Sequence, residues 1–168
     1  MEKPLFNMVI MALTALVPMV IGFIWYSPMV FGKTWMSSAG LTEEKVKGGN
    51  MPLILGLSYV FSLFLAMALG GIVIHQNGLF SIFQGDQNAE GLAATLEFLN
   101  TNVPSWGTNF RTFGHGAIHG VFTGIFVVLP IIATNALFER KSFKYIMVNW
   151  GYWVVTLILM GGIICQFS

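Results

Sequence analysis

Long apolar stretches alternate with short polar segments along this chain of 168 residues. A bilayer core of about 30 Å is crossed by about 20 residues in helical conformation. Four stretches reach that length, over residues 6–26, 52–75, 113–135 and 145–165, and none of them contains Asp, Glu, Lys or Arg. The pattern predicts an all-α membrane protein built as a bundle of four transmembrane helices.

Two of the polar segments carry signals for shorter helices. Thr42 precedes Glu43 and Glu44, and a hydroxyl followed by acidic residues is typical of a helix start. In the long loop over residues 76–112, leucines recur at helical spacing and predict a short amphipathic helix. These leucines are Leu92, Leu96 and Leu99. The helix either lies on the outer membrane surface or packs on the bundle.

The composition narrows the class of protein further. Hydrophobic residues make up 55% of the chain and charged residues 9%, whereas soluble domains average about 25% charged residues. An ordinary soluble enzyme is therefore excluded. The net charge of +1 provides no basic face for a nucleic acid, and a single cysteine, Cys165, cannot form an internal disulfide. The expected partner is the lipid bilayer.

The basic residues are unevenly divided between the two sides of the predicted bundle. Six Lys and Arg residues fall in the first and third loops, and two fall on the opposite side. The six are Lys33, Lys45, Lys47, Arg140, Lys141 and Lys144, and the two are Lys3 and Arg111. The positive-inside rule then predicts that both termini and the loop 76–112 face the periplasm from a bacterial inner membrane.

Two prolines interrupt the first and third predicted spans. Pro18 and Pro130 each remove one helical hydrogen bond, which frees the carbonyls of Thr14 and Phe126. Local kinks are the favoured interpretation, and a shared cavity is the alternative. The first span resembles the third around the prolines, at residues 16–20 and 128–132, and the second span resembles the fourth, at Leu69-Gly70-Gly71-Ile72 and Met160-Gly161-Gly162-Ile163. This likeness is consistent with two related helical hairpins or with chance likeness of apolar segments.

The third predicted span contains glycines at four-residue intervals. Gly116, Gly120 and Gly124 leave a groove in which another helix can approach closely. The partner is either a helix of the same chain or a helix of a second copy.

Three histidines fall near the outer ends of the second and third predicted spans. His115 and His119 lie one helical turn apart, and His75 ends the preceding span on the same side. Together they could bind a metal ion, or two of them a haem. No carboxylate or second cysteine in the spans adds a ligand. Hydrogen-bonded histidines are therefore the favoured interpretation, with no cofactor expected.

Polar and aromatic residues gather near the predicted cytoplasmic ends of the spans. They are Trp25, Tyr26, Asn135, Asn149, Tyr152 and Trp153. Such residues suit the headgroup layer, where they anchor helices. An anchoring belt is the favoured interpretation, and a ligand pocket is the alternative.

Several short motifs resemble a bacterial membrane family catalogued as a domain of unknown function, DUF1761. The motifs are Trp25-Tyr26-Ser27-Pro28, Phe31-Gly32-Lys33, Trp35-Met36, Gly40-Leu41-Thr42-Glu43-Glu44, His119-Gly120, Asn135 with Leu137-Phe138-Glu139, Asn149 with Gly151-Tyr152-Trp153, and Met160-Gly161. The resemblance covers nearly the whole chain except the outer loop. It implies a small multi-span protein of the bacterial inner membrane, and no established activity or catalytic residues.

These observations favour a non-enzymatic membrane protein that forms a homo-oligomer or serves as an accessory subunit of a larger membrane complex. Common hydrolase and nucleotide-binding motifs are absent from the sequence. The first alternative is a metal- or haem-binding redox component that uses the three histidines. The second is a permease for a neutral or apolar solute, since the spans lack the charged residues that mark proton-coupled carriers.

Overall fold

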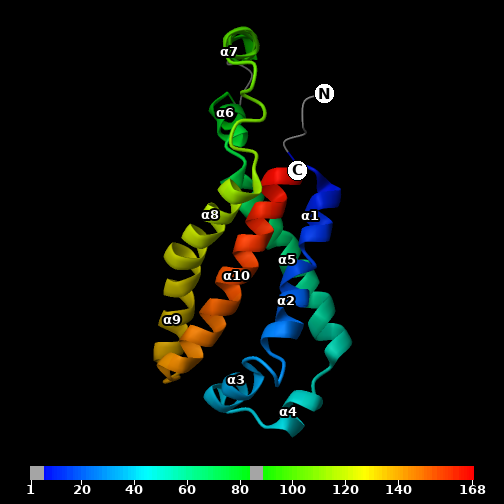
Figure 1. Cartoon of the computed structure of the whole chain (residues 1–168), viewed down its shortest axis with the longest axis vertical. Helices are drawn as coiled ribbons and strands as arrows, with labels where there is room; N and C mark the ends of the chain where they lie inside the picture. Colours follow the sequence, from blue (N-terminus) through cyan, green and yellow to red (C-terminus); the bar gives the residue numbers. More distant parts are fainter. Residues whose placement is uncertain (1–5, 84–88) are drawn as a thin grey trace.

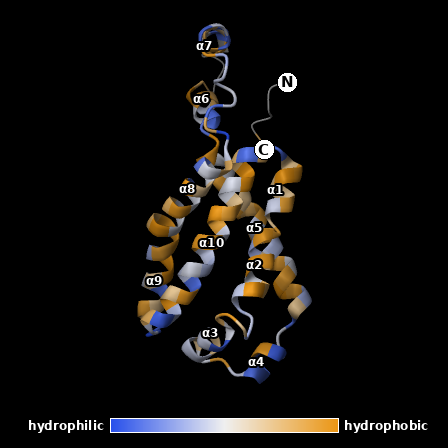
Figure 2. Cartoon of the chain, viewed as in Figure 1, coloured by the Kyte–Doolittle hydropathy of each residue, from blue (hydrophilic) through white to orange (hydrophobic). Residues whose placement is uncertain are grey.

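The computed structural model describes residues 6–83 and 89–168, and it contains four helical segments of membrane length. They are Met8–Trp25, Met51–Val73, Phe113–Phe138 and Phe143–Phe167. Figure 1 shows them running along the long axis of the molecule, and Figure 2 shows that hydrophobic residues predominate along them. The predicted all-α bundle with four membrane-length helices is confirmed.

The first span is divided into two helices beside its proline. α1 covers Met8–Thr14 and α2 covers Val17–Trp25, with Pro18 in the first turn of α2. The break follows from the missing amide hydrogen of proline. The Tyr152 hydroxyl donates a hydrogen bond of 2.8 Å to the Pro18 carbonyl and so ties the interrupted span to the fourth.

The third span stays helical but changes its winding before its proline. α8 covers Phe113–Thr123, a π-helical turn, η2, covers Gly124–Val128, and α9 covers Leu129–Phe138. Pro130 lies in the first turn of α9. The indole of Trp150 donates a hydrogen bond of 2.9 Å to the Gly124 carbonyl in the widened turn.

The second and fourth spans are continuous. α5 covers Met51–Val73 and α10 covers Phe143–Phe167. α10 is the central helix. Half of its most apolar stretch is buried, whereas the buried share is 22% or less in the other three spans. Its buried side chains form the core with residues of α1 and α5. This core comprises Met11, Ala66, Leu69, Val73, Ile74, Leu157, Met160, Ile164 and Cys165.

Two short helices close one end of the bundle, which we call the lower end because it is drawn so in Figure 1. α3 covers Gly32–Ala39 and α4 covers Glu43–Lys47. The Thr42 hydroxyl accepts a hydrogen bond of 3.3 Å from the Lys45 amide, as expected for the start of α4. α3 was not expected from the sequence, and it ends at Gly40, whose φ of 74° favours glycine.

The opposite, upper end carries two further helices. α6 covers Gln76–Ile82 and α7 covers Ala89–Asn102. α7 contains the helix predicted from the leucine spacing. Figure 1 shows it beyond α6 and apart from the spans, so the alternative in which it packs on the bundle is wrong. The start of α1 and the end of α10 also lie at the upper end, which agrees with two hairpins of the same direction.

Candidate metal centre

The three histidines are positioned by the end of α5 and the start of α8. His75 lies two residues beyond the end of α5. α8 begins after Thr112, whose hydroxyl accepts a hydrogen bond of 3.3 Å from the His115 amide. His119 lies one turn further on the same helix face, because residues four apart are neighbours on an α-helix. The helix start therefore fixes the positions of two of the three imidazoles.

The three side chains converge through the same ring atom. The Nε2 atom of His119 lies 3.0 Å from that of His75 and 3.1 Å from that of His115, and the third separation is 3.4 Å. The planes of the three rings cross at 72° to 87°. The rings are thus arranged around a common point rather than stacked.

Such a triangle of nitrogens suits a cation better than hydrogen bonds among neutral rings. The Nε2 of a neutral imidazole either donates one hydrogen bond or offers one lone pair. One donor can satisfy one acceptor, so the third nitrogen of the triangle has no complementary partner in it. A tetrahedral Zn²⁺ with bonds of about 2.0–2.1 Å places its nitrogen ligands about 3.3 Å apart. The observed separations are close to this value.

The position of α8 is fixed by direct contact between its backbone and that of α10. A methyl group added to Gly116 or Gly120 would overlap the backbone of α10, at the carbonyls of Gly161 and Leu157 respectively. A methyl group added to Gly124 would meet the side chain of Val154, which also belongs to α10. The partner helix of the glycine groove is therefore one of the same chain. The close contact gives the two histidines of α8 a rigid support.

Phe110 covers the histidines on one side. Its ring centroid lies 5.2 Å from that of His115 and 6.0 Å from that of His75. The residue has a φ of 63°, which is costly for an aromatic residue, and its carbonyl accepts a hydrogen bond of 3.2 Å from the Cys165 thiol. Unfavourable backbone conformations of this kind are concentrated at ligand-binding and active sites.

Arg111, a basic residue close to the histidines in sequence, bonds to the end of α10. Arg111 is 6% exposed, and its guanidinium donates hydrogen bonds to the carbonyls of Cys165, at 3.2 Å, and Ser168. Its charge therefore lies against the last carbonyls of α10, where a helix favours positive charge. Burial lowers the pKa of Arg111 from its ordinary value.

The two threonines near the histidines bond to the backbone. Thr112 caps the start of α8, and the Thr123 hydroxyl donates a hydrogen bond of 2.8 Å to the His119 carbonyl. Among residues 6–83 and 89–168, the cluster of potential metal ligands contains three imidazoles and no carboxylate or thiol. Three protein ligands leave the fourth position of a tetrahedral ion open.

The polar and aromatic residues predicted near the lower end are only partly brought together. The Tyr26 hydroxyl donates a hydrogen bond of 3.0 Å to the Asn149 side chain. The ring of Tyr152 lies 5.2 Å from that of Tyr26 in a tilted arrangement and 5.0 Å from that of Trp153 in an edge-to-face arrangement, measured between centroids. Asn135 is exposed on α9 and does not join these contacts. The cluster therefore connects α2 with α10.

This cluster borders a mainly apolar cavity of about 850 Å³ between α2, α5 and α10. Pro18 lines the cavity, together with Tyr26, Tyr152 and Trp153. Pro130 does not line it. The cavity thus lies beside one of the two prolines, and not between both as the sequence had suggested as an alternative.

The fold and the lengths of its helices define a multi-pass membrane protein with four candidate spans. The chain belongs to the protein family of unknown function DUF1761, whose family model matches residues 9–165. No curated protein and no solved structure matches the chain. The family carries no assigned activity, so the site geometry provides the argument about function.

Proposed function

We propose that this protein binds a divalent transition-metal ion of the zinc or copper type through His75, His115 and His119. One observation carries the proposal, namely the convergence of three Nε2 atoms at mutual distances of 3.0, 3.1 and 3.4 Å. Imidazole nitrogen is a preferred ligand for zinc, copper, iron and nickel. The sequence had favoured hydrogen-bonded histidines, and the triangle supports the metal-binding alternative instead.

The geometry favours a single ion over a haem. Two histidines that bind a haem iron from opposite faces hold their nitrogens about 4 Å apart, twice a metal–imidazole bond, with the flat macrocycle between them. His75 and His119 bring their Nε2 atoms to 3.0 Å, and His115 occupies the space beside both. A macrocycle does not fit between rings arranged in this way.

The proposed role is binding rather than catalysis on a substrate. Hydrolysis at a zinc centre uses a neighbouring general base, commonly a carboxylate. No carboxylate joins the histidine cluster among the described residues. His75 is exposed, and the other two rings are partly exposed, so an ion can reach the site from the upper end. A centre of this kind suits a metal-carrying component of a membrane system.

The test is metal analysis of the full-length protein purified in detergent without chelators. We expect close to one zinc or copper ion per chain. His119→Ala removes one of three ligands, and we expect it to weaken binding at least about 100-fold, because loss of a supporting group outside the ligand set alone costs about 10–100-fold. Titration calorimetry with Zn²⁺ and with Cu²⁺ measures this change.

Cys165→Ser is the matched control. The Cys165 thiol has two carbonyl acceptors beside the site, those of Phe110 at 3.2 Å and Val73 at 3.5 Å, and donates its one hydrogen to either of them, as a serine hydroxyl can also do. The control should bind the ion as the unaltered chain does. Equal and weak binding of both ions by the unaltered chain and by His119→Ala would contradict the proposal, as would loss of binding in the control alone.

The orientation that we propose places the metal centre on the periplasmic side of a bacterial inner membrane. Its support is the excess of basic residues at the lower end. A reporter that is active only in the periplasm should be active when fused after Asn102 and silent when fused after Lys45. The opposite result would place the metal centre on the cytoplasmic side and leave the metal-binding proposal intact.

An oligomeric or accessory role stays a prediction. The glycines of α8 that suggested self-association contact α10 of the same chain, so an interface between copies would use another face. Light scattering of the purified protein, corrected for bound detergent, measures the number of copies. If the protein binds metal as a monomer, the metal-binding proposal applies to the single chain and the homo-oligomer is excluded.

A further inference from the structure

A second hollow lies at the lower end of the bundle, whereas the histidines lie at the upper end. It has a volume of about 780 Å³ and lies between α3, the turn after α9 and the first turn of α10. Its lining residues are Lys33, Thr34, Ser37, Ser38, Gly40, Glu139, Arg140, Lys141, Ser142 and Lys144. Basic groups and hydroxyls thus predominate around it.

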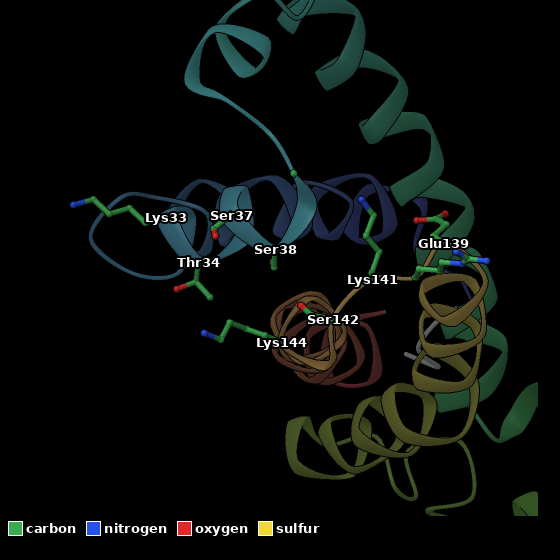
Figure 3. Close-up of a pocket in the computed structure, with 10 residues that line it drawn as sticks. Lys33, Thr34, Ser37, Ser38, Glu139, Lys141, Ser142 and Lys144 are labelled. Atoms are coloured by element: carbon green, nitrogen blue, oxygen red, sulfur yellow. The ribbon is translucent and has the colours of Figure 1, made fainter.

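The charges around this hollow favour an anion. Four of the eight Lys and Arg residues of the chain line it, against one carboxylate, that of Glu139. Figure 3 shows Lys33 and Lys144 extending toward the same side with Thr34 between them, while Glu139 lies on the other side. The carboxylate therefore lies apart from the two lysines and does not neutralise their side of the hollow.

The start of α10 adds to the positive potential of the hollow. The first amide groups of a helix have no partner within it and carry partial positive charge. α10 has 25 residues and no acidic residue in its first turn. Ser142, which lines the hollow, caps the Tyr145 amide. Backbone amides, hydroxyls and ammonium groups are together the usual ligands of a phosphate group.

The walls of the hollow are held together by Lys141. Its ammonium group donates a hydrogen bond of 2.8 Å to the carbonyl of Ala39, the last residue of α3, and lies 5.8 Å from the centre of the Tyr145 ring. This contact joins α3 to the beginning of α10. Lys141 therefore shapes the hollow, whereas Lys33 and Lys144 remain available for a ligand.

The surroundings distinguish a lipid from a free anion. Large apolar side chains next to the lining residues in sequence are highly exposed, with Leu137, Phe138 and Phe143 at 68%, 87% and 73%. In a membrane-spanning helix such side chains face the acyl chains. The hollow thus lies at the boundary between apolar and polar surface, where a phospholipid presents its phosphate. Basic pockets between membrane helices bind anionic headgroups.

We infer that the hollow between α3 and the start of α10 binds the phosphate-containing headgroup of an anionic phospholipid. Lys33 and Lys144 contact the phosphate from two sides, and Thr34 donates a hydrogen bond between them. The acyl chains extend along the exposed apolar surface near Phe138 and Phe143. The site is independent of the proposed metal centre, which lies at the upper end.

Native mass spectrometry of the full chain in detergent tests this inference. The probes are dioleoyl phosphatidylglycerol, dioleoyl phosphatidylcholine with the same acyl chains, and inorganic phosphate. We expect the unaltered chain to retain phosphatidylglycerol in preference to phosphatidylcholine. The double variant Lys33→Gln, Lys144→Gln should bind phosphatidylglycerol about 30-fold more weakly, on the basis of about fivefold for each lysine near a membrane surface.

The double variant Lys45→Gln, Lys47→Gln is the matched control, because it removes the same charge from α4 at the same end of the molecule. It should retain phosphatidylglycerol as the unaltered chain does. Equal losses in the two double variants would overturn the inference, since binding would then follow total charge. Displacement of phosphatidylglycerol by millimolar inorganic phosphate would also overturn it, in favour of a site for the free anion. Circular dichroism checks that both variants are folded.

Discussion

On one side of α10 lies α8, with glycines of the two helices in backbone contact, and on the other side α2 and α5 leave a cavity of about 850 Å³. The residues at each contact account for the difference. Gly116 and Gly161 carry no side chains and let the backbones meet, whereas Tyr152 and Trp153 point large rings toward α2 and α5. One helix thus supports a rigid site and an open space together.

The largest effect is expected where the contact is closest. Gly120→Ala places a methyl group against the Leu157 carbonyl, which is backbone and cannot move aside easily. We expect a loss of about 3 kcal/mol in the free energy of unfolding, at the upper end of the overpacking range. Displacement of α8 should also weaken metal binding by His115 and His119. Denaturant unfolding in mixed micelles measures the first effect.

Gly71→Ala is the control for this substitution. Gly71 is exposed on α5, and an added methyl group would have nothing within 4 Å. Equal unfolding free energies for the two variants would remove the distinction between the two sides of α10.

A smaller effect is expected across the cavity. Tyr152→Phe removes the 2.8 Å hydrogen bond to the Pro18 carbonyl that joins the interrupted first span to α10. Hydrogen bonds between membrane helices contribute about 0.6–1 kcal/mol on average, so a loss of that size in the unfolding free energy is expected. Tyr145→Phe is the control, because Tyr145 contacts Lys141 through its ring. A loss of 3 kcal/mol in Tyr152→Phe would show that the cavity side is as tightly coupled as the glycine side.

The smallest expected effect is an increase in the free energy of unfolding, and not a loss. A methyl group added to Gly22 on α2 would lie 3.7 Å from the Tyr152 ring, an ordinary van der Waals distance. Gly22→Ala should therefore raise the unfolding free energy by up to about 1 kcal/mol through the higher helix propensity of alanine. A fall comparable to that of Gly120→Ala would show that α2 and α10 approach as closely as α8 and α10.

The elements that could be predicted from the sequence are those fixed by local patterns. Apolar length marks the spans, and the hydroxyl of Thr42 with the following glutamates marks α4. α3 was missed because Gly32–Ala39 is only eight residues long and starts without a capping side chain, and its position depends on the distant contact of Lys141 with Ala39. The hollow at the lower end was missed for the same reason.

The candidate site shows the same division. The one-turn spacing of His115 and His119 could be recognised in the sequence, and His75 could be assigned to the same end. The meeting of all three Nε2 atoms could not be predicted, since it depends on how the end of α5 packs beside α8 after a long intervening loop. The left-handed conformation of Phe110 gave no sequence signal either, because that region favours glycine or asparagine.

The π-helical turn Gly124–Val128 also gives the third span a place where a change in chain length can be absorbed. Its defining bond runs from the Leu129 amide to the Gly124 carbonyl, five residues back, so the turn contains one residue more than an α-helix needs. Such a turn is an α-helix with one residue inserted, and the wider winding absorbs that residue. Loss of one residue here would restore α-helical winding, so that α9 would keep its present orientation and the histidines of α8 would stay in place. During evolution, this turn can therefore gain or lose a single residue without reorienting the lower half of the span and without disturbing the proposed metal centre above it.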